Sequence, residues 1–314
     1  MRRFGVPAAS APVEAASEWP GIKAWRSAQT ARGGGSRSEA LRRFLREPGG
    51  VIGAALLTAL LLTALLAGVV YPGDPLQSVA PPLLAPGQSL AFPLGADSLG
   101  RDLAAELAHG ARTSLVVGGG AAAVGLLMGV VLGSIAGYFG GWVEAAVSRA
   151  TEVFQATPMF LLVVVIVALL GAHATVITFA ISLTSWQTIA RLVRAEFRQQ
   201  LQSDFVVAAR AFGHSSAWII VREILPNVLP SIIVMASFKV ASAIFMESTL
   251  AFLGLGDPNS VSWGSMINEG RDFIRSAWFL TVTPGAMIFV TVLSLNLIGD
   301  ALSDVLNPRL RGEA

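Results

Sequence analysis

The chain has 314 residues, of which 54% are hydrophobic and only 13% are charged, with a formal net charge of +2. A soluble protein of this size carries about twice that charged fraction, so the composition excludes an ordinary soluble domain and indicates an integral membrane protein. The chain contains no cysteine, which excludes disulfides and thiolate chemistry, and its 3 histidines lie too far apart to form a metal-ligand motif.

The first third of the chain predicts a tail, one membrane span and a loop. Residues 1–40 are rich in Ala, Gly, Ser, Pro and Arg without an apolar period, which predicts a disordered cytoplasmic tail. The segment 41–72 predicts a short interfacial segment followed by the first span, since 51–71 is uncharged and long enough to cross a bilayer. An extracytoplasmic loop is expected at 73–112.

The remaining five spans are expected within 113–306. They follow from uncharged or nearly uncharged stretches at 113–143, 153–190, 224–246 and 276–299. The second of these has 38 residues, which is too long for one span, and we expect it to turn at 171–175 and form two. A short cytoplasmic tail is expected at 307–314.

The positions of Lys and Arg predict the orientation, because cytoplasmic segments of membrane proteins carry the excess of these residues. Seventeen lie in the N-terminal 50 residues, in the connections 144–152 and 191–223, and at the C-terminus. Four lie in 72–112 and 254–275. The sequence therefore predicts an all-α integral membrane protein with six transmembrane helices and both termini in the cytoplasm.

Small residues recur every four positions in the second span and form one helix face: Gly125, Gly129, Gly133 and Gly137. Such a face allows two helix backbones to approach closely. Two alternatives remain for it, a helix of the same subunit or a second subunit. Pro158 and Pro284 lie inside predicted spans and are expected to kink them.

An amphipathic stretch interrupts the apolar sequence between the fourth and fifth spans, on the predicted cytoplasmic side. It reads "SDFVVAARAFGHSSAWIIVREILPNVLP" (203–230). Its first half has an apolar face at helical spacing, made of Phe205, Val206, Ala209 and Phe212. Gly213 is expected to end this first helix, Ser215 or Ser216 to cap a second, and Pro226 to end that one. The apolar face is expected to pack either on its own bundle or on a partner.

Within this stretch, "VAARAFG" and "ILP" resemble the cytoplasmic EAA loop of permease subunits of bacterial ATP-binding-cassette importers. In that family the loop is a coupling helix that docks in a groove of the ATPase subunit. Val207 stands where the motif calls for Glu, and Asp204 supplies an earlier acidic residue as in the peptide-importer branch, a helix cap being the alternative role. The resemblance assigns coupling to Asp204, Ala208, Ala209, Gly213, His214, Ile224, Leu225 and Pro226.

Further stretches resemble the dipeptide/oligopeptide/nickel branch of this family. "PLGADSLGRDLAAELAHGARTSLVVG" (93–118) is similar to its outward loop, and "ESTLAFLGLGDPNSVSWGSMINEGR" (247–271) with "NLIGDALSDVLNPRL" (296–310) is similar to the end of its second permease, the dipeptide permease C type. Matching residues of the outward loop include Gly95, Asp97, Gly100, Arg101, Asp102 and Arg112. The charges among them either cap a helix and pair locally or contact an extracytoplasmic binding protein.

The resemblance extends from about residue 40 to 311 and implies a type I importer permease fold in the bacterial inner membrane. It implies four partners: a second homologous permease, two ATP-binding subunits on the cytoplasmic side and an extracytoplasmic solute-binding protein. No nucleic acid is implied. The implied substrates are di- or oligopeptides, with nickel or another small solute as the alternative.

The chain is not expected to be an enzyme or to bind a cofactor or metal. It has no GxxxxGK[ST] loop to hold nucleotide phosphates and no hydrolase motif, so the resemblance implies that ATP and Mg²⁺ bind to partner subunits. A stand-alone secondary transporter or channel is a less favoured alternative, because it predicts an internal inverted repeat that this sequence does not display.

Polar residues inside the predicted spans are candidates for the translocation pathway, since charges at that depth face a partner or a wet cavity. Lys239 lies inside the fifth span, where it meets either a substrate carboxylate or an acid of a neighbouring helix. Glu247 lies near the outer end of the same span, where the family also has an acidic residue. Asn296 and Asp300 lie near the cytoplasmic end of the last span, with interhelical hydrogen bonds as the alternative role.

Overall fold

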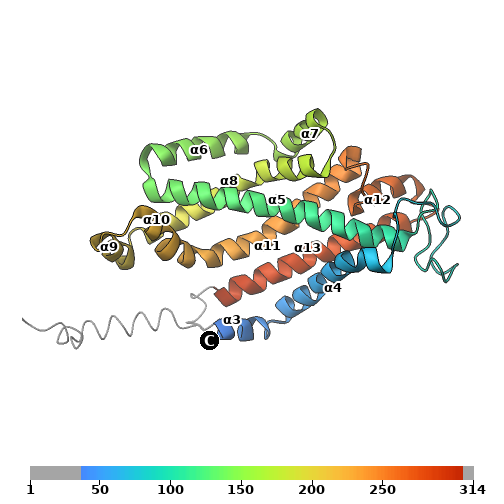
Figure 1. Ribbon diagram of the computed structural model, residues 1–314, viewed down its shortest axis with the longest axis horizontal. Helices are drawn as coiled ribbons and strands as arrows, with labels where there is room; N and C mark the ends of the chain where they lie inside the picture. The colour runs from blue at the N-terminus through green and yellow to red at the C-terminus, as the bar shows by residue number, and fades with distance from the viewer. Residues whose placement is uncertain (1–36, 307–314) are drawn as a thin grey trace, which may run out of the picture. The chain divides into compact units, whose positions relative to one another are not determined.

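The computed structural model describes residues 37–306, and every regular element in that range is a helix (Figure 1). The chain divides into two units, Met1–Arg46 and Glu47–Ala314. The described part of the first unit contains helix α3 (Arg37–Phe44), so residues 37–40 are helical, although the sequence predicts a disordered tail up to residue 40. Residues 1–36 and 307–314, for which tails are predicted, lie outside the described residues.

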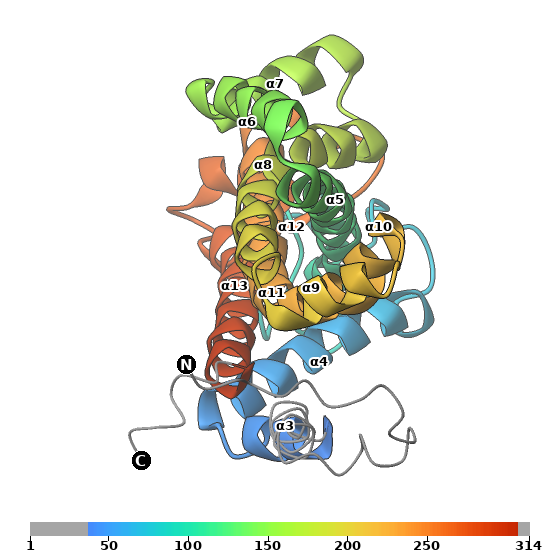
Figure 2. The same cartoon turned by 90° about the vertical axis from the view of Figure 1, so that its left-hand side faces the viewer.

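The second unit is a helical bundle. Its elements are, in chain order, α4 (Pro48–Val70), α5 (Leu103–Phe139), α6 (Gly141–Ala156), α7 (Met159–Leu170), α8 (Ala174–Gln200), α9 (Asp204–Ala211), α10 (Ser216–Trp218), the π-helical turn η1 (Ile219–Ile224), α11 (Leu225–Leu250), the π-helical turn η2 (Ala251–Leu255), α12 (Trp263–Gly270), the 3-10 turn η3 (Arg271–Phe273) and α13 (Phe279–Leu306). The long helices lie side by side: α5 packs against α8, α11 and α4, and α13 packs against α11 and α4 (Figures 1 and 2).

The number of membrane spans agrees with the sequence analysis. Among the described residues, five helical stretches are long and apolar enough to cross a membrane: α4, α5, α8, the continuous run Ser216–Leu255, and α13. The pair α6 and α7 adds a sixth span when its two helices are counted together. All six overlap the uncharged stretches that predict them, but α6 also includes the charged segment 144–152, which the sequence predicts as a cytoplasmic connection.

The third span is broken rather than kinked. α6 and α7 meet at an angle of 85°, and Pro158 lies at the break as the residue that precedes α7. Thr157 before it is extended, with φ −94° and ψ 132°, as steric conflict with a following proline requires. α7 ends before Gly171, whose φ of 95° favours glycine and forms the turn predicted at 171–175. Pro284, in contrast, lies inside an unbroken α13.

The second span begins ten residues earlier than its uncharged stretch indicates. α5 starts at Leu103, where the Asp102 side chain accepts a hydrogen bond from the Ala104 backbone N–H at 3.0 Å and caps the helix. Its 37 residues correspond to about 55 Å, which exceeds the thickness of a bilayer. Residues 103–112 of the predicted loop are therefore three helical turns, and their charged residues hid this from a search for uncharged stretches.

The glycine stripe of α5 (Gly125, Gly129, Gly133 and Gly137) packs against α8 of the same subunit. A Cβ atom added to Gly129 would lie 2.6 Å from the Cβ of Ile189 and 2.7 Å from the carbonyl oxygen of Trp186. Each of the other three would also collide with α8. Of the two alternatives for this stripe, the structure therefore supports packing within the subunit. This close packing also fixes the position of α8, which leads into the loop at 203–226.

Candidate functional site

The loop at 203–226 forms the predicted helix pair. Ser203 precedes α9, and the first helix ends at Phe212 and Gly213, whose φ of 77° is the left-handed conformation that glycine adopts without strain. The Ser215 hydroxyl accepts a hydrogen bond from the Trp218 backbone N–H at 3.3 Å and caps the second helix. The predicted break at Gly213 and the predicted serine cap are both confirmed.

One side of this helix pair is buried in its own bundle. Val206 and Ala209 of α9 pack against Ile219 and Ile224 of the second helix, in a cluster that also contains Phe197 of α8. All five side chains are buried. Because these contacts hold the loop to α8, a displacement of the loop would be transmitted to the spans on either side of it.

The other side of the helix pair is exposed and apolar. Phe212 is 82% exposed, although the sequence analysis puts it on the packing face with Val206. Phe212 still belongs to the last helical turn, with φ −76° and its N–H bonded to the Ala208 carbonyl oxygen at 3.0 Å. Its own bundle covers Val206 and Ala209 but does not reach Phe212, so packing of Phe212 on a partner stays a prediction. Val207 and Val221 are also exposed. Among the described residues other than its chain neighbours, no atom lies within 4 Å of where a Gly213 side chain would begin, which leaves the tip of the loop open.

Two ring contacts complete the loop. The His214 ring stacks on Trp218 with centroids 3.8 Å apart, and the Arg210 guanidinium lies 5.5 Å from the ring centroid of Tyr138 at the end of α5. Asp204 is the exposed first residue of α9, where the helix dipole favours a carboxylate, and its side chain is not the cap. Ala208 is exposed as well.

Pro226 does not end the second helix, contrary to the sequence analysis. The chain continues as one helical run, Ser216–Leu255, and Pro226 lies in the first turn of α11 directly after the π-helical turn η1. A proline removes one backbone donor, and a π-helical turn shifts the pattern of hydrogen bonds where that donor is missing. Ile224, which is buried, and Leu225, which is half-buried, thus belong to a rod that joins the loop to the fifth span.

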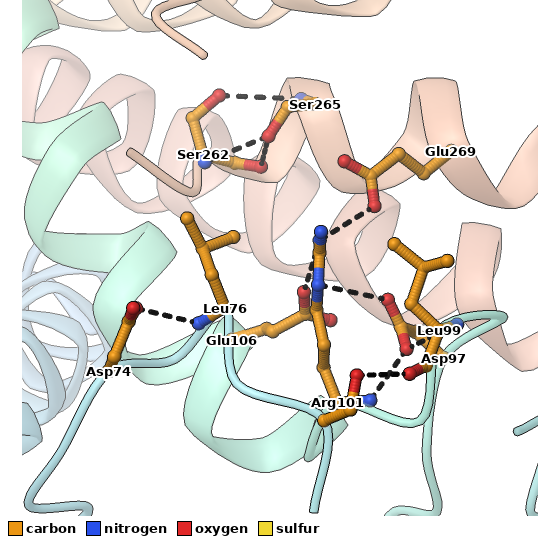
Figure 3. A network of polar contacts seen from close by, with 10 residues as sticks. Asp74, Leu76, Asp97, Leu99, Arg101, Glu106, Ser262, Ser265 and Glu269 are labelled. Carbon is orange, nitrogen blue, oxygen red and sulfur yellow. Dashed lines mark hydrogen bonds and ion pairs between the residues drawn. The ribbon is translucent and has the colours of Figure 1, made fainter. Parts of the chain in front are cut away.

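Arg101 lies at the centre of an ion-pair network that joins the outward loop to α5 and α12 (Figure 3). Its Nη1 atom is 3.1 Å from Glu269 Oε2 and 3.4 Å from Glu106 Oε1, and its Nε atom is 3.8 Å from Asp97 Oδ2. The three carboxylates lie within 4.8 Å of one another, a spacing that would suit a metal ion, but the guanidinium supplies the cation. Burial raises the pKa of Glu269, which Arg101 only partly offsets.

The backbone of the outward loop is built around Asp97. Its Oδ1 atom accepts hydrogen bonds from the backbone N–H groups of Leu99 at 2.9 Å and Arg101 at 2.7 Å. Gly95 and Gly100 both have positive φ, and a side chain on either would collide with the backbone of residues 80–85. The Asp102 cap and the Arg101–Asp97 pair are the helix cap and local pairing of the first alternative, and contact with a binding protein stays a prediction. Arg112 is exposed on α5, apart from the network.

Replacing Arg101 with Met is expected to destabilise the protein by about 3 kcal/mol, because removing one partner leaves the buried carboxylates of Asp97 and Glu106 uncompensated. The measurement is the free energy of unfolding in detergent. The matched control is Arg149→Met, which removes an exposed ion pair with Glu152 and should lower stability by less than about 1 kcal/mol. Equal losses of stability in the two variants would contradict the inference that Arg101 compensates the buried carboxylates.

The three pathway candidates have different surroundings. Glu247 is 3% exposed, accepts a hydrogen bond from Ser248 Oγ at 3.3 Å and also bonds to Ser114 and Ser262. It therefore lies inside the subunit where α5, α11 and α12 meet. Lys239 is half-buried on α11 with the Arg191 charge close by. Asn296 is half-buried on α13, and among the described residues its side chain has no hydrogen-bond partner.

Two structural features were not anticipated from the sequence. A polar ladder joins α6 to α8, in which Arg191 donates to Gln155 at 3.2 Å, Arg194 to Ser148, and Arg198 pairs with Glu144 at 2.7 Å. The spacing of Arg at 191, 194 and 198 marks one helix face and could have indicated it.

The second unanticipated feature is a distant cap. Asp257, after η2, accepts a hydrogen bond from the backbone N–H of Ala174 at 3.0 Å and caps α8. Burial opposes its ionisation, but hydrogen bonds from Asn259 and Ala174 lower the pKa of the carboxyl. No local sequence signal points to a cap 83 residues away.

The described residues thus form a helical bundle with five spans, or six when α6 and α7 count as one, with an exposed apolar loop and a charged network. Residues 129–312 match the family described as binding-protein-dependent transport system inner membrane component. Residues 37–86 match the N-terminal transmembrane domain of oligopeptide transport permease C.

Curated relatives cover most of the chain. A di/tripeptide transport system permease protein of Pseudomonas aeruginosa is 36% identical over 86% of this chain and 91% of its own length. A glutathione transport system permease protein of Pectobacterium atrosepticum is 36% identical over 86% and 90%. A dipeptide transport system permease protein of Bacillus subtilis is 36% identical over 87% and 86%.

The chain belongs to the family of binding-protein-dependent transport system inner membrane components, in the oligopeptide permease C group. It is an inner-membrane permease of an importer of the peptide and glutathione group, and not an enzyme. Its transport system includes a binding protein and an ATPase. This family excludes the alternative of a stand-alone secondary transporter.

Proposed function

We propose that this chain and a second, homologous permease form the translocation pathway of an importer for di- or oligopeptides. Two ATP-binding subunits, which carry ATP and Mg²⁺, supply the energy, and an extracytoplasmic binding protein delivers the substrate. The observation that carries the proposal is the division of the 203–226 loop into a buried side, which includes Val206, and an exposed apolar side at Phe212.

The loop has the properties of a docking element. The exposed Phe212 side chain lies next to Gly213, where no side chain blocks access, so a groove of another protein can bury it. Its buried side joins α8 to the rod that contains α11. A push on Phe212 would therefore reach two spans at once and shift the bundle between inward-open and outward-open states.

The peptide substrate is supported by the names of relatives that cover more than four fifths of the chain. Glutathione, named for another relative, is itself a small peptide. Nickel is the second candidate, because the outward-loop motif is common to nickel permeases. The metal-like spacing of Asp97, Glu106 and Glu269 does not favour it, since Arg101 already neutralises this group.

The substrate is tested on the binding protein of the same transport system. We expect calorimetric titration to detect binding of dialanine or trialanine, and no binding of Ni²⁺. Glutathione is the third ligand, and its binding distinguishes a glutathione importer from an importer of ordinary di- or tripeptides. Tight binding of Ni²⁺ without binding of any of these peptides would contradict the proposed substrate.

A further inference from the structure

Two cations lie at about the same level, Lys239 on α11 and Arg191 on the side of α8 that contacts α6. The hydrogen bond from Ser231 Oγ to Glu196 Oε1, 3.0 Å long, fixes the register of the two helices, which run in opposite directions. From that bond toward the outer side, Arg191 is five residues away along α8, or about 7.5 Å, and Lys239 is eight residues away along α11, or about 12 Å. The side chain of Lys239 easily spans the difference, and the Arg191 charge acts on it.

Neither cation has a carboxylate partner among the residues whose side chains the structure describes. Arg191 donates to the neutral amide of Gln155 at 3.2 Å. The carboxylates nearby on α6 and α8 have other partners: Glu144 pairs with Arg198 at 2.7 Å, Glu152 pairs with Arg149 at 2.8 Å, and Glu196 binds Ser231 at 3.0 Å. Arg191 lies at the start of the predicted cytoplasmic connection, and among the described residues Glu196 bonds to a hydroxyl and to no cation. Lys239 lies inside a span without a paired carboxylate, which favours an anion from outside this chain.

The face of α11 that carries Lys239 is directed away from α13. Ser237 and Phe238 contact Gly299 of α13. Lys239 is two residues beyond Ser237, which corresponds to a rotation of about 200° around the helix. Arg191 is exposed and Lys239 is half-buried in the isolated subunit. Because charges at this depth are not stable in lipid, this face borders the second subunit or a water-filled path.

We propose that Lys239 and Arg191 together bind a carboxylate of the transported solute as it passes through the membrane. The inference rests on the proposed function, in which the solute is a peptide with a free C-terminal carboxylate. An ammonium and a guanidinium at one level offer charge-assisted hydrogen bonds to such a group. A fixed carboxylate of the second permease could bind the two cations in the same way. The experiment must therefore distinguish it from the carboxylate of the solute.

The test uses the complete importer in proteoliposomes, with trialanine and trialanine amide as probes. We expect Lys239→Gln and Arg191→Gln each to slow trialanine uptake about tenfold or more, and Lys239→Arg to retain most of it. Uptake of trialanine amide, which lacks the carboxylate, should be the same in wild type and variants. The control is Arg149→Gln, whose side chain is 83% exposed and paired with Glu152, and which should leave both rates unchanged.

Three results would overturn the inference. Normal trialanine uptake by Lys239→Gln would mean that the cation is not used. A loss of amide uptake as large as that of trialanine would mean that the carboxylate is not recognised. Failure of Lys239→Gln to co-purify with the second permease would identify a fixed carboxylate of that subunit as the partner. Failure of the wild-type importer to transport trialanine would instead refute the proposed function, and the inference would fall with it.

Discussion

Replacement of Phe212 with Asp is expected to reduce substrate-stimulated ATP hydrolysis by the assembled importer about thirtyfold or more, the effect of losing a central interface residue worth at least about 2 kcal/mol. Phe212 is 82% exposed, so the bundle itself does not depend on it. A carboxylate buried in an apolar groove of the ATPase without a partner would oppose docking. The measurement is the rate of phosphate release with and without loaded binding protein.

The controls for this prediction follow from the two sides of the loop. Phe212→Leu keeps an apolar side chain and should retain most of the stimulation. Gly213→Asp is also expected to abolish it, because Gly213 has φ 77° and sits at the open tip. Ala209→Asp would not distinguish a loss of docking from a loss of folding, since Ala209 is buried and a charge there would disrupt the fold. Full stimulation in Phe212→Asp, with the permease pair intact, would contradict the docking role.

Replacement of Gly129 with Ala is expected to destabilise the subunit by about 1–3 kcal/mol, the range for overpacking a close contact. The added Cβ would lie 2.7 Å from the backbone carbonyl oxygen of Trp186, so α5 and α8 must separate. Gly129→Leu should prevent their packing altogether. Reversible unfolding in mixed detergent micelles gives the free energy of unfolding.

A matched control lies on the same helix. Gly119 has no atom within 4 Å of where its Cβ would lie, and it has no positive φ. Gly119→Ala should therefore be neutral, or stabilising by up to about 1 kcal/mol through its better helix propensity. A loss of stability at Gly119 equal to that at Gly129 would mean that the glycine stripe is not what holds α5 against α8.

The spans and the loop were predictable because their signals are local. Uncharged stretches locate six spans, and Gly213 and Ser215 mark the turn of the loop by their own conformational preferences. The start of α5 was missed because a charged turn outside the bilayer does not differ from a loop in composition. The exposure of Phe212 was missed because the helical period places a residue on a face but does not say how far along that face the bundle reaches.

The contacts that were not predicted join residues far apart in the chain. Arg101 binds Glu269 across 168 residues, and Asp257 caps α8 across 83 residues. No periodicity in one segment specifies which other segment it will meet. Lys239 was recognised as unusual from its position in a span, but its neighbour Arg191 became apparent only when α8 and α11 were in register.

ATP-dependent accumulation of radiolabelled trialanine in proteoliposomes tests the central claim most directly. This permease is reconstituted with the proposed second permease, the two ATPases and the binding protein. The account predicts accumulation against a gradient that requires ATP and the binding protein, and that is lost in Phe212→Asp. Peptide movement by this chain without ATP or binding protein, or accumulation that persists in Phe212→Asp, would contradict it.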